Sequence, residues 1–231
     1  GSTDATFDSN SNKVVICYAG GSDHGTAIVG TVSGTSISFG TAVVYESANS
    51  IGSVATFDSN SNKVVIAYND YTNSQYGTAI VGTVSGTSIS FGTAVVFESA
   101  SIGTTKHSIT FDSNLNKVVI AYEDGGNSDY GTAIVGTVSG TSISFGTAVV
   151  FESASTRDHA ATFDSNLNKV IIAYRDEGNS NKGTVITGAV SGTSISFESP
   201  TIFEGDAVQF ITTVFDSNSN TSVISYRDDG N

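Results

Sequence analysis

The stretch "GTAIVGTVSGTSISFGTAVV" occupies Gly25–Val44 and occurs again, letter for letter, at Gly77–Val96 and Gly131–Val150. A degraded copy, "GTVITGAVSGTSISFESPTI", fills Gly183–Ile202. Val, Ile, Thr and Phe favour strands, and the Gly and Ser residues between them favour turns. The chain is therefore a tandem array of β-rich repeats, and such arrays form solenoids or propellers.

A Phe-Asp pair marks the start of every repeat. It occurs at Phe7, Phe57, Phe111, Phe163 and Phe215, so the steps between repeats are 50, 54, 52 and 52 residues. We expect a single domain, 1–231, with four full repeats and a partial fifth; their approximate bounds are 3–52, 53–106, 107–158, 159–210 and 211–231.

Each full repeat contains four predicted strands, which in the second repeat are Ser53–Asp58, Lys63–Tyr68, Gly77–Val84 and Ile89–Phe97. The second of these is apolar almost throughout, so both of its faces must be covered. A period near 50 with four strands per unit is typical of β-propellers. We therefore predict an all-β fold, a five-bladed β-propeller of four-stranded antiparallel blades whose last blade has two strands. A β-solenoid is the main alternative, although its rungs are usually shorter.

The repeats resemble those of five-bladed, tachylectin-like propellers. They also resemble tandem "FDSNSNKVVIAY…GTAIVGTVSG" repeats of marine viral and bacterial surface proteins. The resemblance covers almost the whole chain and concerns its architecture. It implies a protein of lectin or adhesion type, placed outside the cell or on a virion or cell surface.

The last predicted blade has an open edge. The chain begins at a first strand and ends after a second strand, so the edge at Ser222–Tyr226 has no third strand to pair with. Open edges invite pairing with other chains. We expect a second copy to cover this edge, giving a homo-oligomer, or the native chain to continue beyond Asn231.

The composition excludes several classes of partner. The chain has 22 acidic and 9 basic residues, a net charge of −13, which repels nucleic acid and anionic lipid. No apolar run reaches the ~18 residues that a membrane span needs, so we expect no membrane insertion. The single cysteine, Cys17, aligns with Ala67, Ala121 and Ala173 and is interpreted as a small buried residue. We expect no cofactor and no metal.

Variation among the repeats is concentrated in two segments. The turns "DSNSN" and "SGTS" hardly change, whereas the loop after the second strand and the segment between repeats differ in every copy. Up-and-down connectivity places both variable segments at one end of the blades. Because binding residues commonly lie on loops held by a rigid scaffold, we predict a binding surface there that includes His107, Arg157 and His159. The alternative is that these loops vary because nothing constrains them.

The loop after the second strand carries the pattern Y-x-D-x-x-N-S in three repeats. Asp and Asn side chains can hydrogen-bond to sugar hydroxyls, and Tyr offers a face for stacking. The alternative is that Asp and Asn satisfy backbone amides in an Asx-turn. The candidate glycan-binding residues are Tyr68, Asp70 and Asn73; Tyr122, Asp124 and Asn127; and Tyr174, Asp176 and Asn179.

Other site chemistry is disfavoured. "DSNSN" is similar to the start of a calcium loop, but Lys63 stands where an EF-hand needs Gly, and a strand follows at once. The acids Glu46, Glu98, Glu152 and Glu204 recur at equivalent positions and are interpreted as structural. We predict no enzymatic activity, because catalysis needs groups with different roles.

Two functions remain. The first is a multivalent attachment module that recognises glycans, in which several weak sites gain avidity against a repeated ligand. The second is a structural or oligomeric scaffold of duplicated blades with no small-molecule ligand.

Overall fold

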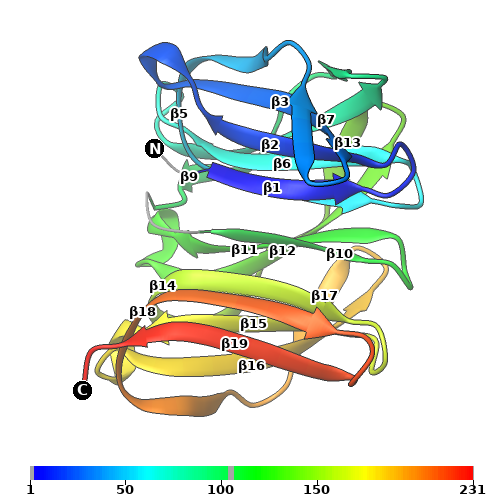
Figure 1. Cartoon of the computed structure of the whole chain (residues 1–231). Helices are drawn as coiled ribbons and strands as arrows, with labels where there is room; N and C mark the ends of the chain where they lie inside the picture. The colour runs from blue at the N-terminus through cyan, green and yellow to red at the C-terminus, as the bar shows by residue number, and fades with distance from the viewer. Residues whose placement is uncertain (1–2, 104–106, 231) are drawn as a thin grey trace. The chain divides into compact units, whose positions relative to one another are not determined.

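A computed structural model of the chain describes residues 3–103 and 107–230, which are almost entirely β-strand (Figure 1). The prediction of an all-β fold is confirmed. The chain divides into two compact units: unit one comprises residues 1–104 and 138–144, and unit two comprises residues 105–137 and 145–231.

The first two repeats form a nine-stranded antiparallel sheet. Its main path is β1-β2-β3-β5-β6-β7-β8, with β4 added to β3 and β9 added to β7. The elements in chain order are β1 (Thr3–Asp8), β2 (Lys13–Ala19), the 3-10 turn η1 (Gly21–Asp23), β3 (His24–Ser33), β4 (Ser36–Phe39), β5 (Val43–Asp58), β6 (Lys63–Asp70), β7 (Tyr76–Ser85), β8 (Ser88–Phe91) and β9 (Val95–Ser101).

The remaining repeats form a ten-stranded sheet. Its main path is β10-β11-β12-β14-β15-β16-β18-β19, with β13 added to β12 and β17 added to β16. The elements are β10 (Ser108–Asp112), β11 (Lys117–Asp124), η2 (Gly125–Asn127), β12 (Tyr130–Ser139), β13 (Ser142–Phe145), β14 (Val149–Asp164), β15 (Lys169–Asp176), η3 (Glu177–Asn179), β16 (Lys182–Ser191), β17 (Ser194–Phe197), β18 (Thr201–Asp216) and β19 (Thr221–Asp228).

Five separate blades are not what the strand pairing shows, because long strands join consecutive repeats. β5 pairs with β3 through its first part, up to Asn49, and with β6 through its second part, from Ser50 to Asp58. β14 and β18 are also 16 residues long, and each pairs with two strands in the same way: β14 with β12 and then β15, and β18 with β16 and then β19. At these three junctions the segment between repeats, which we predicted as a loop, is therefore extended chain that contains a β-bulge. Between the second and third repeats, β9 ends at Ser101 and β10 begins at Ser108.

The fourth strand of each repeat is broken. In the second repeat the predicted strand Ile89–Phe97 appears as β8 and β9, which pair with the two halves of β7 on the same edge. The break falls at Gly92, whose Cα lies so close to the next hairpin that a β-carbon would be 1.8 Å from the carbonyl oxygen of Thr141.

Both invariant turns have a local explanation. In "DSNSN" the Asp58 carboxylate accepts the amides of Asn60 and Ser61, each at 2.9 Å, and Asn62 takes a left-handed conformation with φ of 55°. In "SGTS" the two-residue hairpin needs a positive φ at its first central position, which glycine supplies at Gly86 with φ of 62°. The carboxylate that a calcium loop would use is thus occupied by the turn itself.

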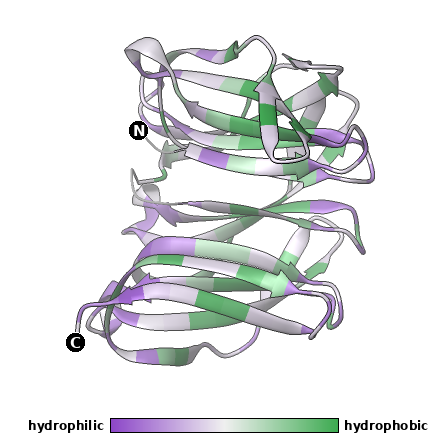
Figure 2. Cartoon of the chain, viewed as in Figure 1, coloured by the Kyte–Doolittle hydropathy of each residue, from purple (hydrophilic) through white to green (hydrophobic). Residues whose placement is uncertain are grey.

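The core lies between the sheets of consecutive repeats. The back of the first repeat (Val15, Cys17, Ala27, Val29) packs on the front of the second (Phe57, Val64, Ile66, Ile80, Ile89). Repeats three and four pack in the same way, with Val119, Ala121, Ala133 and Val135 against Phe163, Val170, Ile172 and Ile195. Hydrophobic residues accordingly run along the middles of the strands in Figure 2.

Cys17 is a free thiol in this core, as its alignment with alanines predicts. Burial raises the pKa of the Cys17 thiol to about 12, and the nearby Asp4 charge adds to the rise. The side chain therefore behaves as a small apolar group at neutral pH.

Candidate functional site

The two variable segments of the chain lie side by side. The carbonyl of Gln75 accepts the amide of Ile102 at 3.3 Å, and the equivalent bonds join Asp129 to Thr156 and Asn181 to Val208, both at 3.1 Å. In the second, third and fourth repeats the loop after the second strand is thus fixed to the following inter-repeat segment. Within each unit we call this surface the variable end; in the described residues it comprises 19–24, 69–76, 47–54 and 99–103 in unit one, and 123–130, 175–182, 153–160 and 205–212 in unit two.

The loops share one backbone feature although their side chains differ and the first loop is shorter than the others. Every loop contains two consecutive residues with positive φ, and they are Ser22 and Asp23, Ser74 and Gln75, Ser128 and Asp129, and Ser180 and Asn181. A left-handed conformation costs a non-glycine residue roughly 1 kcal/mol or more, so the surrounding hydrogen bonds must hold it. In each unit the variable end therefore presents different side chains on a recurring backbone turn.

The predicted Asp and Asn residues have different roles: aspartates bond to the backbone of their own loops, and asparagines face solvent. Asp70 accepts the amide of Asn73 at 3.1 Å, and Asp124 accepts the amide of Gly126 at 3.0 Å, so both carboxylates cap their own loops. Burial raises the pKa of Asp124 and of Asp176. Asn73 and Asn127 are exposed and Asn179 is half-buried, so the amide side chains face solvent more than the carboxylates do.

The predicted tyrosines do not lie on the surface. Tyr68, Tyr122 and Tyr174 are fully buried. The hydroxyl of Tyr68 donates to Glu46 at 3.3 Å and that of Tyr174 donates to Glu152 at 3.1 Å, in each case linking one repeat to the preceding one. These rings cannot stack on a ligand, and the recurrent glutamates have the structural role that their repetition predicts.

Two of the predicted histidines are also buried. His159 bonds through Nε2 to the Thr156 hydroxyl at 2.8 Å and packs edge-on against Phe151. His107, just before β10, is buried to the same extent. The equivalent position in the second repeat is Ser53, which bonds to Tyr45 at 2.6 Å. Because this position fills the core beneath the bulge of the long strand, the histidines are not available at the surface.

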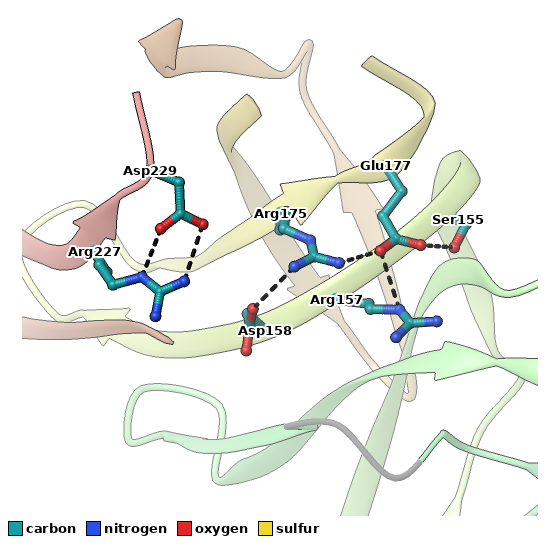
Figure 3. Close-up of polar contacts among 7 residues, drawn as sticks. All are labelled: Ser155, Arg157, Asp158, Arg175, Glu177, Arg227 and Asp229. Atoms are coloured by element: carbon teal, nitrogen blue, oxygen red, sulfur yellow. Dashed lines mark hydrogen bonds and ion pairs between the residues drawn. The ribbon is translucent and has the colours of Figure 1, made fainter. Parts of the chain in front are cut away.

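Arg157 belongs to a charged cluster that the sequence pattern reveals only in part (Figure 3). It lies opposite Arg175 in the pairing of β14 with β15. Glu177 contacts Arg157 at 3.1 Å and Arg175 more closely, and it accepts the Ser155 hydroxyl at 2.8 Å. Asp158 lies 3.9 Å from Arg175. The charges of the two arginines are thus balanced by two acids. Only the strand register of β14 with β15 shows that Arg157 and Arg175 lie opposite each other.

Exposed aromatic rings occur at the variable end where the sequence analysis did not place them. Tyr71 follows Asp70 directly and is exposed. Phe210 is exposed on β18, and the Arg227 guanidinium lies 5.0 Å from the centre of its ring. Arg227 also donates two hydrogen bonds to Asp229, at 2.6 and 3.1 Å. A signal for Tyr71 existed, since it is an aromatic residue just beyond the end of a predicted strand.

The search of solved structures identifies proteins of the same fold. SapL1 lectin in complex with alpha methyl fucoside aligns with a TM-score of 0.57 and 12% identity, covering 98% of this chain and 71% of that one. A triple arginine-to-alanine mutant of AofleA from Arthrobotrys oligospora aligns with a TM-score of 0.51 and 6% identity, covering 97% and 78%. The chain has a lectin-like all-β fold. No protein-family model and no curated protein sequence matches it.

In the described part of the chain, no group of three or more His, Cys, Asp or Glu side chains could hold a metal ion. The same residues contain no helix of the length and hydrophobicity needed to cross a membrane.

The charged cluster gives a pH-dependent prediction. Burial acts to raise the pKa of Glu177. Hydrogen bonds from Arg175 and Ser155 outweigh this effect and hold that pKa below its ordinary value of 4.5. A lowered pKa means that Glu177 stabilises the fold above pH 4.5 and that this contribution is lost as the pH falls further. We expect Glu177→Gln to lower the free energy of unfolding by about 1–3 kcal/mol at pH 7, because two arginines lose their shared acceptor.

The measurement is urea unfolding at pH 7 and pH 3, where the difference between wild type and Glu177→Gln should shrink in acid. Glu198→Gln is the matched control, since Glu198 pairs with Lys169 in solvent and should matter little. A difference that stays constant with pH would mean that Glu177 acts through packing and not through its charge.

Proposed function

We propose that the chain is a non-enzymatic, multivalent glycan-binding module that recognises its ligand through the variable end. The observation that carries the proposal is the concentration of changing polar side chains on loops that share a two-residue turn with positive φ, repeated along the chain. The fold shared with a lectin solved in complex with alpha methyl fucoside supports the choice of ligand class. The same proposal places the protein outside the cell or on a virion or cell surface.

The chemistry of the surface is suited to sugars. Asn73 and Asn127 can donate and accept hydrogen bonds, and the half-exposed guanidinium of Arg157 can donate to hydroxyls. Tyr71 and Phe210 take over the stacking role that the sequence analysis assigned to the buried tyrosines. Asp70 and Asp124 support their loops, and His107 and His159 lie buried in the core.

We also propose that each repeat is one blade of a propeller, with two strands in the fifth. Support comes from the packing inside each unit, where the sheets of consecutive repeats meet face to face. Repeated blades would place several equivalent weak sites on one molecule, and a ligand that is itself repeated would then be bound with avidity.

A glycan array that includes fucosides, probed with the whole chain, tests the proposed function. We expect binding that falls about tenfold or more in the triple variant Tyr71→Ala, Asn73→Ala, Asn127→Ala, because a stacking face and two polar contacts are lost together. The matched control is Asn60→Ala with Asn114→Ala, which changes exposed residues of the invariant turns. The proposal is wrong if no glycan is bound, or if both sets of variants bind equally well.

A further inference from the structure

Arg157 differs in charge from the residues at the equivalent place on the other long strands. It lies on β14 opposite Arg175 of β15, whereas Ile51 stands at this place on β5 and Gln209 on β18. Two guanidinium groups opposite each other in a strand pair repel one another unless acids lie close by. Because β5 and β18 form with neutral residues at this place, the long-strand fold does not require an arginine there.

The acids of the cluster balance the two arginines but do not cover Arg157. The exposed fraction of the side chain is 41% for Arg157, 23% for Glu177, 17% for Arg175 and 14% for Asp158. All four residues belong to unit two. Their charges sum to zero, yet the group that is most exposed to solvent is a cation. The cluster therefore presents a positive group on a chain whose net charge is −13.

Arg157 meets the cluster through a single nitrogen. Its Nε atom is buried and lies 3.1 Å from the Glu177 carboxylate. Among the described residues, no hydrogen bond or ion pair engages the two Nη atoms of Arg157, and no dashed line reaches them in Figure 3. A guanidinium is planar, so its two Nη atoms lie side by side and match the two oxygens of a carboxylate.

Glu177 holds Arg157 in this orientation. One of its carboxylate oxygens contacts both arginines, and the other accepts the Ser155 hydroxyl at 2.8 Å. Arg175 is held in turn, since it also lies 3.9 Å from Asp158. Because Glu177 has three partners, Arg157 is already positioned and loses little freedom when a ligand binds.

We propose that Arg157 selects a carboxylated sugar, a uronic acid or a sialic acid, through a paired contact between its two Nη atoms and the ligand carboxylate, with Glu177 as a positioning residue. This inference rests on the proposed glycan-binding function and adds a ligand class to the variable end of unit two. Asn179 is half-buried on the same η3 turn as Glu177, and its amide can bond to hydroxyls of the ring.

Isothermal titration calorimetry of the whole chain with paired sugars tests the proposal. The probes are methyl β-glucuronide and the methyl α-glycoside of N-acetylneuraminic acid, each compared with its methyl ester, which keeps the ring and removes the charge. We expect at least one acid to bind about tenfold or more tightly than its ester, because a charge-assisted paired contact forms only with the acid. Arg157→Gln should abolish this preference. Arg157→Lys should restore only part of it, since an ammonium group lacks the paired nitrogens.

Lys169→Gln is the matched control for the loss of one positive charge. Lys169 lies at the opposite end of β15 from Arg175 and pairs with Glu198, so its replacement should leave the preference for the acid unchanged. Far-UV circular dichroism and urea unfolding check that each variant keeps its fold.

Three results would overturn the inference: equal binding of both acids and their esters, equal effects of Arg157→Gln and Lys169→Gln, or an Arg157→Lys variant that binds like the wild type. Titration with methyl fucoside and the esters separates this failure from that of the proposed function. If these neutral sugars bind without any preference for acids, the proposed function stands and the inference falls. If no sugar of either kind binds, both fall.

Discussion

Replacing Gly146 with alanine should lower the free energy of unfolding of unit two by about 3–5 kcal/mol, or prevent its folding. A β-carbon at Gly146 would lie 1.9 Å from the carbonyl oxygen of Thr193 and 2.8 Å from its Cβ. Thr193 belongs to the tight hairpin between β16 and β17, whose register leaves it little freedom to move. The clash must therefore be relieved by separating the sheets of two consecutive repeats.

The chain provides its own control for this prediction. Gly40, Gly92 and Gly146 occupy equivalent positions, and each would clash with the "SGTS" hairpin of the next repeat. The fourth repeat has Glu198 at this position, and the fifth described repeat contains no such hairpin. Glu198→Ala should leave the unfolding midpoint essentially unchanged. Unfolding can be followed by far-UV circular dichroism and by tyrosine fluorescence, since the chain lacks tryptophan. Equal stability of Gly146→Ala and wild type would show that the hairpin yields.

Replacing Tyr174 with alanine should cost unit two about 3–5 kcal/mol, because it leaves a cavity between two repeats. The Tyr174 ring is fully buried and lies 5.1 Å from the ring of Phe151. Tyr174→Phe should cost about 1 kcal/mol, since it removes only the hydrogen bond from the hydroxyl to Glu152. Urea unfolding of both variants separates the packing contribution from the hydrogen bond.

The matched control is Tyr18, which occupies the same position in the first repeat and is only half-buried. Tyr18→Ala should therefore cost clearly less than Tyr174→Ala. Burial, and then the Glu152 charge, raise the pKa of Tyr174 above its ordinary value of 10. The stabilisation that the protonated Tyr174 hydroxyl gives to the folded state should consequently be lost as the pH rises above about 10. Equal costs for the two alanine variants would mean that the repeat interface adds nothing to this position.

The sequence predicted the local structure of this protein closely. Lys63–Tyr68 and Gly77–Val84 lie within β6 and β7, and both invariant turns occur where their residue types favour them. It could also have predicted the burial of Tyr68, because this residue closes an apolar run that needs cover on both faces. The prediction that Tyr68 stacks on a sugar was therefore wrong, because the ring is fully buried.

The candidate site was less predictable because its members meet through pairing between strands. Arg157 and Arg175 are 18 residues apart in the chain, and only the register of β14 with β15 places them opposite each other. The bulge in the long strand turns His159 inward and leaves Arg157 half-exposed. Residue types alone do not show where a bulge lies. The sequence therefore could not show that His159 is buried while Arg157, two residues before it, is half-exposed.

The sequence by itself determined the repeat length, most of the strands and both invariant turns. These are consequences of short-range preferences, since alternation of apolar residues and turn-forming residues acts over a few positions. Only the tertiary structure decided which of the identical side chains are buried. Phe7 and Phe57 stand in the same local sequence, but burial depends on the neighbouring sheet, and a neighbour is a long-range property that no repeat contains within itself.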